Sequence, residues 1–168
     1  WVNVTEGLAK AGGPRERWVS RVFASSHQPG TAYVAKNGYR HDDFAPYLFR
    51  TSDFGATWTS IGNGLPDQPI NVVWQDRQNP GLLYVGNDKG VWVSLDDGSH
   101  WVRMKGNMPS VPVHDLLIRG GDVVDGQRRL HDPGARLHEQ DAADVHAGRG
   151  ELLGHGGQAP GEAEALSN

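Results

Sequence analysis

The sequence predicts an all-β fold: a partial β-propeller of about two four-stranded blades, with flanking strands and a disordered C-terminal tail. First, its apolar runs are short, rich in β-branched and aromatic residues, and bounded by Gly, Pro, Asn and Asp, as strands usually are. Second, no stretch has a sustained helical period with caps. Third, the chain contains an internal repeat. Four short antiparallel strands that recur about every 40 to 45 residues are typical of propeller blades.

An eight-residue motif marks the repeat. It occurs as Thr51–Trp58 and again as Ser94–Trp101, and both copies read Ser/Thr-x-Asp-x-Gly-x-x-Trp. We expect each copy to form the turn between the third and fourth strands of a blade. The Asp accepts hydrogen bonds from N–H groups of the turn, the Gly takes a positive φ, the Ser or Thr bonds across the turn, and the Trp packs against the adjoining blade. The structural residues are therefore Thr51, Asp53, Gly55 and Trp58 in the first copy and Ser94, Asp96, Gly98 and Trp101 in the second.

The match extends to the strands around the motif. Pro29–Ala35 parallels Pro80–Gly86, and a leading apolar run opens each copy and recurs at 113–118. For the second copy we predict strands at about 70–75, 82–86, 90–94 and 101–104. Residues 1–4 match residues 58–61, so we expect them to form the closing strand of an earlier blade.

These matches divide the chain into five segments. They are the end of a preceding blade with a linker (1–17), a blade (18–66), a second blade (67–110), the first strand of a next blade (111–119), and a non-repeat, low-complexity tail (120–168).

The tail differs from the rest in composition. Residues 120–168 hold 10 of the 23 Gly and 9 of the 20 acidic residues but no aromatic residue. Such a segment buries too little apolar area to offset its chain entropy, so we expect disorder. Two explanations stay open: an out-of-frame reading of GC-rich DNA, or a natural low-complexity end.

Composition also excludes several functions. The chain has no Cys, which removes disulfides, thiolate metal sites and thiol nucleophiles. A formal charge of −4 provides no basic footprint for nucleic acid, and the apolar runs are too short for membrane insertion. No pattern indicates a metal or a cofactor, and no targeting segment is recognised.

The repeated motif and its strands resemble the Asp-box, or BNR, repeats found in sialidases, xyloglucanases and sortilin-type receptors. The fuller pattern resembles large sortilin-like bacterial propellers often labelled glycosyl hydrolases. It consists of Tyr33–Val34, Asp42–Asp43, Pro46–Thr51, the Asp box, Leu82–Gly86 and Gly90–Ser94. The resemblance covers about residues 1–119. It implies a propeller, an extracellular or periplasmic location, and a need for neighbouring blades of the parent chain.

The best candidate ligand-binding residues lie in an insertion within 36–46, which the second copy lacks. They are Tyr39, Arg40, His41, Asp42 and Asp43. Binding residues often lie on loops held by a rigid scaffold, which favours a functional interpretation. The alternative is that Asp42 and Asp43 cap the turn while the aromatic residues fold back onto the blade. No catalytic residue is identified.

Two function classes follow. The first is a binding or scaffolding module for protein or glycan ligands, in which the residues seen are not themselves catalytic. The alternative is part of a sialidase- or xyloglucanase-like glycoside hydrolase whose catalytic acids lie outside this chain. The repeat region contains only two Glu and no paired carboxylates of the kind that most glycosidases use, which favours the first class.

Overall fold

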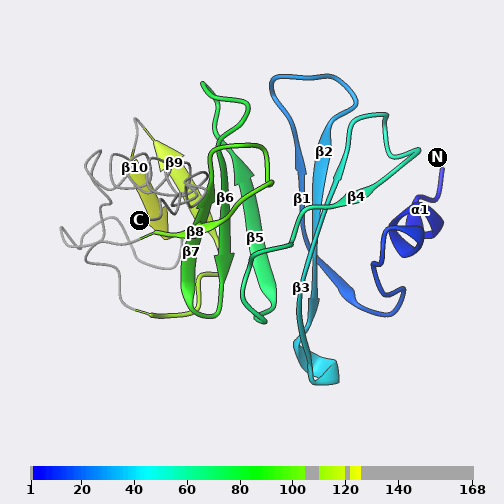
Figure 1. The fold of residues 1–168 in the computed structure, drawn as a ribbon, viewed down its shortest axis with the longest axis horizontal. Coiled ribbons are helices and arrows are strands. Elements are labelled where there is room, and N and C mark those ends of the chain that lie inside the picture. Colours follow the sequence, from blue (N-terminus) through cyan, green and yellow to red (C-terminus); the bar gives the residue numbers. More distant parts are fainter. Residues whose placement is uncertain (1, 105–109, 120–121, 126–168) are drawn as a thin grey trace, which may run out of the picture.

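The computed structural model describes residues 2–104, 110–119 and 122–125. These residues form two four-stranded antiparallel sheets and a two-stranded hairpin, which lie next to one another in chain order (Figure 1). No helix in these ranges has the length and apolar character needed to cross a membrane. The fold is a partial propeller, as the sequence predicts.

The first sheet has the strand order β1-β2-β3-β4. Its strands are β1 (Trp18–Ala24), β2 (Ala32–Gly38), β3 (Asp43–Thr51) and β4 (Thr59–Ser60). Each strand pairs antiparallel with the next, and the first motif connects β3 to β4. We call this sheet the first blade.

The second sheet has the order β5-β6-β7-β8 and repeats the first. Its strands are β5 (Ile70–Gln75), β6 (Leu83–Asn87), β7 (Gly90–Ser94) and β8 (Val102–Arg103). They lie within one or two residues of the predicted strands. We call this sheet the second blade.

The two blades share their register as well as their order. Val22 pairs with Val34 in the first blade, and Val73 pairs with Val85 at the matching positions of the second. The register shifts once in each inner ladder, between Val19 and Arg21 and between Ile70 and Val72. The repeat in the sequence is therefore a repeat in backbone structure down to the β-bulge.

One face of the first blade packs on one face of the second. Tyr33, Ala35 and Leu48 from the first blade form a single buried cluster with residues of the second. The second-blade members are Ile70, Val73, Leu83, Val85 and Trp101, and Leu65 from the connection between the blades joins them. Alternating side chains of a strand point to opposite faces, so Val34 and Phe49 lie on the other face of the first blade.

The structure differs from the sequence prediction near residue 4. No strand forms at Val2–Val4, and Thr5–Lys10 forms a short helix, α1, where the sequence predicted none. A closing strand needs a third strand of its own blade as a partner, and the described residues provide none for this segment. Leu8 of α1 is buried against Val34 and Phe49, which explains why the segment packs on the first blade without joining a sheet.

The region after the second blade forms a hairpin of β9 (Leu116–Arg119) and β10 (Asp122–Asp125). Val113 and Leu116 cover the far face of the second blade, where they pack with Val72, Tyr84 and Val93. The expected tail starts at 120, so the structure departs from that expectation at 122–125, which pair with β9 as a strand. The remainder of the expected tail, 120–121 and 126–168, lies outside the described residues.

Candidate functional site

The insertion in the first blade is a compact turn. The strand β2 ends at Gly38, Tyr39–His41 form one turn of 3-10 helix (η1), and β3 begins at Asp43. Asp42 closes the turn in the left-handed region, with φ 52°. A side chain at Gly38 would collide with Asp43, because a Cβ there would lie 2.6 Å from the Asp43 carbonyl oxygen. The predicted binding loop is therefore fixed by its own backbone.

Asp43 braces this turn. Its carboxylate accepts hydrogen bonds from Arg17 Nε at 2.8 Å, from the Tyr47 hydroxyl at 2.9 Å and from the Ala45 N–H at 3.2 Å. Burial alone would raise the pKa of Asp43, but these bonds and the Arg17 charge outweigh it, so the pKa is lowered. The ionised carboxylate ties β3 to the segment before β1.

The other insertion residues separate into two groups. Tyr39 and Arg40 line a cleft, whereas His41, Asp42 and Asp43 are not among its lining residues. Tyr39 meets Phe44 edge to face, with ring centroids 6.1 Å apart. The Arg40 guanidinium lies 4.2 Å from the ring centroid of Trp18, which is a cation–π contact. The structure thus brings two of the five predicted residues to one site.

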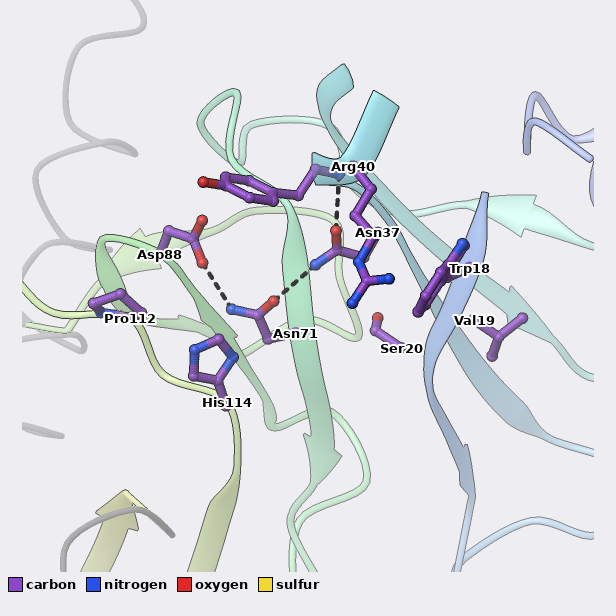
Figure 2. Close-up of a pocket in the computed structure, with 10 residues that line it drawn as sticks. Trp18, Val19, Ser20, Asn37, Arg40, Asn71, Asp88, Pro112 and His114 are labelled. Atoms are coloured by element: carbon purple, nitrogen blue, oxygen red, sulfur yellow. Dashed lines mark hydrogen bonds between the residues drawn. The ribbon is translucent and has the colours of Figure 1, made fainter. Parts of the chain in front are cut away.

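The cleft lies where the first blade meets the second, and its volume is about 430 Å³. Figure 2 shows Trp18 and Arg40 on the first-blade side and Asn71, Asp88 and His114 across from them. Ser20, Asn37 and Pro112 also contribute to the lining. More than half of the Trp18 side chain is exposed, so the indole is open to a ligand at the rim.

A ladder of amide groups crosses the floor of the cleft (Figure 2). The Tyr39 N–H donates to Asn37 Oδ1, Asn37 Nδ2 donates to Asn71 Oδ1, and Asn71 Nδ2 donates to Asp88 Oδ1, each at 2.9 Å. Every link after the first joins residues that are far apart in the sequence. The ladder therefore joins the two blades through side-chain hydrogen bonds.

Sequence reasoning missed most of this cleft. Trp18, Asn37, Asn71, Asp88 and His114 were not among the predicted binding residues. The sequence did contain a signal for two of them, because Asn37 and Asp88 occupy matching positions at the end of the second strand in each copy. Their approach depends on how adjacent blades pack, which no single copy of the repeat reveals.

The two motif copies form nearly identical turns. Thr51 Oγ1 donates to Asp53 Oδ1 at 2.8 Å and accepts the Gly55 N–H at 2.9 Å. Asp53 Oδ1 also accepts the Thr57 N–H at 2.8 Å. In the second copy the corresponding bonds join Ser94 to Asp96 (2.9 Å), Gly98 to Ser94 (2.8 Å) and His100 to Asp96 (2.9 Å).

The indole N–H of each motif tryptophan donates to a backbone carbonyl, one within its own turn and one in the connection between the blades. Trp58 Nε1 donates to the Gly55 carbonyl at 3.1 Å, within its own turn. Trp101 Nε1 donates to the Ile61 carbonyl at 2.8 Å, and its ring lies in the core between the blades. Gly55 and Gly98 both have φ 88°, and the preceding Phe54 and Asp97 are left-handed as well. None of the eight motif residues is among the residues that line the cleft.

Three arginines of the blades have structural partners. Arg50 forms an ion pair with Asp97 at 3.0 Å, and Arg21 pairs with Asp115. Arg103 donates to the Lys89 carbonyl at 3.0 Å. Within the described ranges, no group of three or more His, Cys, Asp or Glu residues is placed to hold a metal ion.

Comparison with known proteins gives a likeness in structure alone. No protein-family model matches the sequence, and no curated protein is similar enough to count as a relative. Among solved structures, an ancestral GH74 enzyme has a TM-score of 0.53 at 17% identity, over 66% of this chain and 14% of that one. The GH74 xyloglucanase from Xanthomonas campestris has a TM-score of 0.48 at 18% identity, over 74% of this chain and 20% of that one.

The first of these likenesses carries information about the fold. The chain spans 14% of the length of the ancestral GH74 enzyme, so it corresponds to a small part of such a protein. At 17% identity, a likeness of this kind concerns the arrangement of the strands and leaves the chemistry open. The two-blade arrangement described above thus matches part of a GH74 enzyme.

Proposed function

We propose that this chain is part of an Asp-box propeller that binds a glycan or protein ligand in the cleft between its two blades. The observation that carries the proposal is the exposed Trp18 indole at the rim of a cleft with a polar floor. A ligand site needs an apolar surface for area and a few fixed polar groups for orientation. Trp18 supplies the first, and the Asn71–Asp88 pair supplies the second.

Each lining residue has a role in this proposal. The Trp18 ring offers apolar area to a sugar ring or an apolar side chain. The Arg40 guanidinium lies over one face of this ring and is a donor of several hydrogen bonds. The amide ladder holds Asn71 and Asp88 in place before a ligand arrives, which lowers the entropy cost of binding. The Asp-box resemblance further suggests an extracellular or periplasmic protein.

A second candidate function is that the parent protein is a glycoside hydrolase. The likeness to a GH74 enzyme favours it. Asp88 is the one carboxylate among the residues that line the cleft, whereas most glycosidases use two carboxyl groups on either side of the scissile bond. In this alternative, the described cleft contributes to substrate binding, and at least one catalytic acid comes from another part of the protein.

Isothermal titration with xyloglucan oligosaccharides, a panel of other glycans and a peptide library tests the binding proposal. We expect saturable binding to one of these ligand classes, weakened at least about tenfold by Trp18→Ala because the stacking surface is lost. Phe54→Ala is the matched control, since it removes another exposed aromatic ring away from the cleft. Equal effects of the two substitutions would contradict the proposal.

The hydrolase alternative is tested by reducing-end release from the same glycans with the full-length parent protein. Asp42→Asn, Asp43→Asn and Asp88→Asn are then compared. Turnover that one of these substitutions abolishes, while the fold is retained, would place a catalytic acid in this chain and replace the binding role.

A further inference from the structure

One face of the first blade is an apolar surface that α1 covers only in part. Val19 is 52% exposed, Val22 is 62% exposed and Phe54 is 82% exposed. They surround a hollow of about 490 Å³, whose lining is mainly apolar and includes Leu8, Val34 and Trp58. A contiguous apolar patch of this kind marks an interaction surface. We call it the near face of the first blade.

The repeat indicates what covers such a face. Val19 and Val22 occupy the register positions that Ile70 and Val73 occupy in the second blade. Ile70 and Val73 are both 0% exposed, because the first blade packs on them. The same face of the same kind of sheet is thus buried where an adjoining blade is present.

The fourth residue of the eight-residue motif contacts the adjoining blade. Asp97 and Phe54 hold this position, with φ 56° and 59°, and their N–H groups donate to the matching Gly81 and Gly30 carbonyls. Asp97 accepts the Tyr33 hydroxyl at 2.8 Å and pairs with Arg50 at 3.0 Å, both from the first blade. Burial and the Asp97 carboxylate raise the pKa of Tyr33, so the phenol stays a neutral donor.

The far face of the second blade lacks this charged pair. Tyr84 and Val93 hold the positions of Tyr33 and Arg50, as the strand registers show. Val93 is buried and packs in a cluster with Val113 and Leu116. The structure therefore contains two kinds of far face: one with Arg50 paired to an acidic motif residue, and one with the apolar Val93 in place of that cation.

Phe54 fits the second kind. The Arg50 side chain is 30% exposed in its pair with Asp97. A guanidinium placed there against a phenyl ring would lose part of its hydration and would exchange the charge pair for a weaker cation–π contact. An apolar side chain such as Val93 would instead bury the Phe54 ring and the two exposed valines at once.

We propose that the near face of the first blade is the docking surface for a further blade of the same polypeptide. That blade carries an apolar side chain at the position that Arg50 holds in the first blade. The residue at the fourth motif position and its counterpart on the covering strand then form a matched pair at each blade junction. This inference is independent of the ligand that the cleft binds.

The test extends the full chain by one blade. A copy of residues 62–100 is placed directly before Trp1, which the sequence repeat aligns with Trp101. The copy either keeps Val93 or carries Val93→Arg, and the original chain either keeps Phe54 or carries Phe54→Asp. Urea unfolding of the four proteins gives the coupling between the two positions.

With Val93 in the copy, we expect Phe54→Asp to lower the folding equilibrium constant about tenfold or more, because a carboxylate is buried without a partner. With Val93→Arg, the same substitution should raise it. In the unextended chain, Phe54→Asp should change the folding equilibrium constant less than about twofold, since the Phe54 ring is exposed. An equal effect of Phe54→Asp in both extended proteins would overturn the proposal.

Two further measurements keep the proposal testable if the extended chain does not fold. In the unextended chain, Arg50→Val and Asp97→Phe should each lower the folding equilibrium constant about tenfold, and the double variant should recover most of the loss. Additive losses would overturn the matched pair. A concentration-dependent dimer that Val22→Asp abolishes would instead assign the near face to a second copy of the chain, and would overturn the assignment to the same polypeptide.

Discussion

Single hydroxyl groups hold the two motif turns together. Ser94 Oγ lies in a buried position, donates to Asp96 and accepts the N–H of Gly98 at 2.8 Å. Thr51 makes the same bonds in the first blade, and its extra methyl group is accommodated there. At the residue scale, the repeat conserves a hydrogen-bonding arrangement, which accounts for the exchange of Ser and Thr between the copies.

Ser94→Ala should destabilise the protein. It leaves the buried Gly98 N–H without an acceptor, which costs about 1–3 kcal/mol. Urea unfolding followed by tryptophan fluorescence measures the loss. Ser52→Ala is the control, because Ser52 is exposed in the other copy of the motif. A loss no larger than that of the control would show that the hydroxyl does not hold the turn.

Acid should weaken the first motif. Hydrogen bonds from the Thr57 hydroxyl and N–H and from Thr51 lower the pKa of Asp53 from its ordinary 3.8 to about 2. The folded state therefore binds fewer protons than the unfolded state between these values. The contribution of Asp53 to the free energy of unfolding is complete above about pH 4 and is lost as the pH falls through about 2.

The urea midpoint at pH 7, 4 and 2.5 measures this effect. Asp53→Asn removes the titrating group, so its midpoint should fall less on acidification than that of the unmodified protein. Asp67→Asn, which changes an exposed carboxylate outside the motif, should leave the acid dependence as it was. An unchanged acid dependence in Asp53→Asn would refute the assigned role.

At the element scale, β1 and β5 have the same pairing but different surroundings. The first blade covers β5, whereas β1 has a bare outer face. Val73→Ala should therefore cost about 1–3 kcal/mol, since it opens a cavity in a packed core. Val22→Ala, at the matching position of β1, should lower the free energy of unfolding by less than about 0.5 kcal/mol. Chemical denaturation of both variants provides the comparison, and equal losses would mean that the blades do not pack as described.

The elements that sequence could predict are those defined within one repeat. The strands β5 to β8 lie close to their predicted positions, because short β-branched and aromatic runs, the residues that bound them and the repeated motif are local signals. The helix α1 was missed because it has only six residues and its N-cap residue, Val4, has no capping side chain. Leu8 is held by packing on the first blade. The sequence of residues 1–10 alone does not predict this contact between α1 and the first blade.

The candidate site was predictable in part for the same reason. The insertion predicted Tyr39 and Arg40 as ligand-binding candidates, and both line the cleft. Asn71 and Asp88 come from the second blade and reach the site only because the two sheets pack face to face. Their contribution depends on the distance between blades, a quantity that the spacing of residues along the chain does not contain.

At the scale of the whole molecule, the account rests on the contact between the two blades. That contact builds the cleft, buries the Trp101 ring and provides the pattern from which the near face is interpreted. If the sheets were independent, the amide ladder and the Tyr33–Asp97 bond would both be absent.

Methyl-selective NOE spectroscopy tests this contact most directly. Leu48 of the first blade and Val73 and Val85 of the second are all 0% exposed and belong to one cluster. The account predicts cross-peaks between the Leu48 methyl groups and those of the two valines, together with cross-peaks from Leu48 to the Trp101 indole. Cross-peaks confined to residues of the same sheet would contradict the packing of the two repeats as adjacent blades.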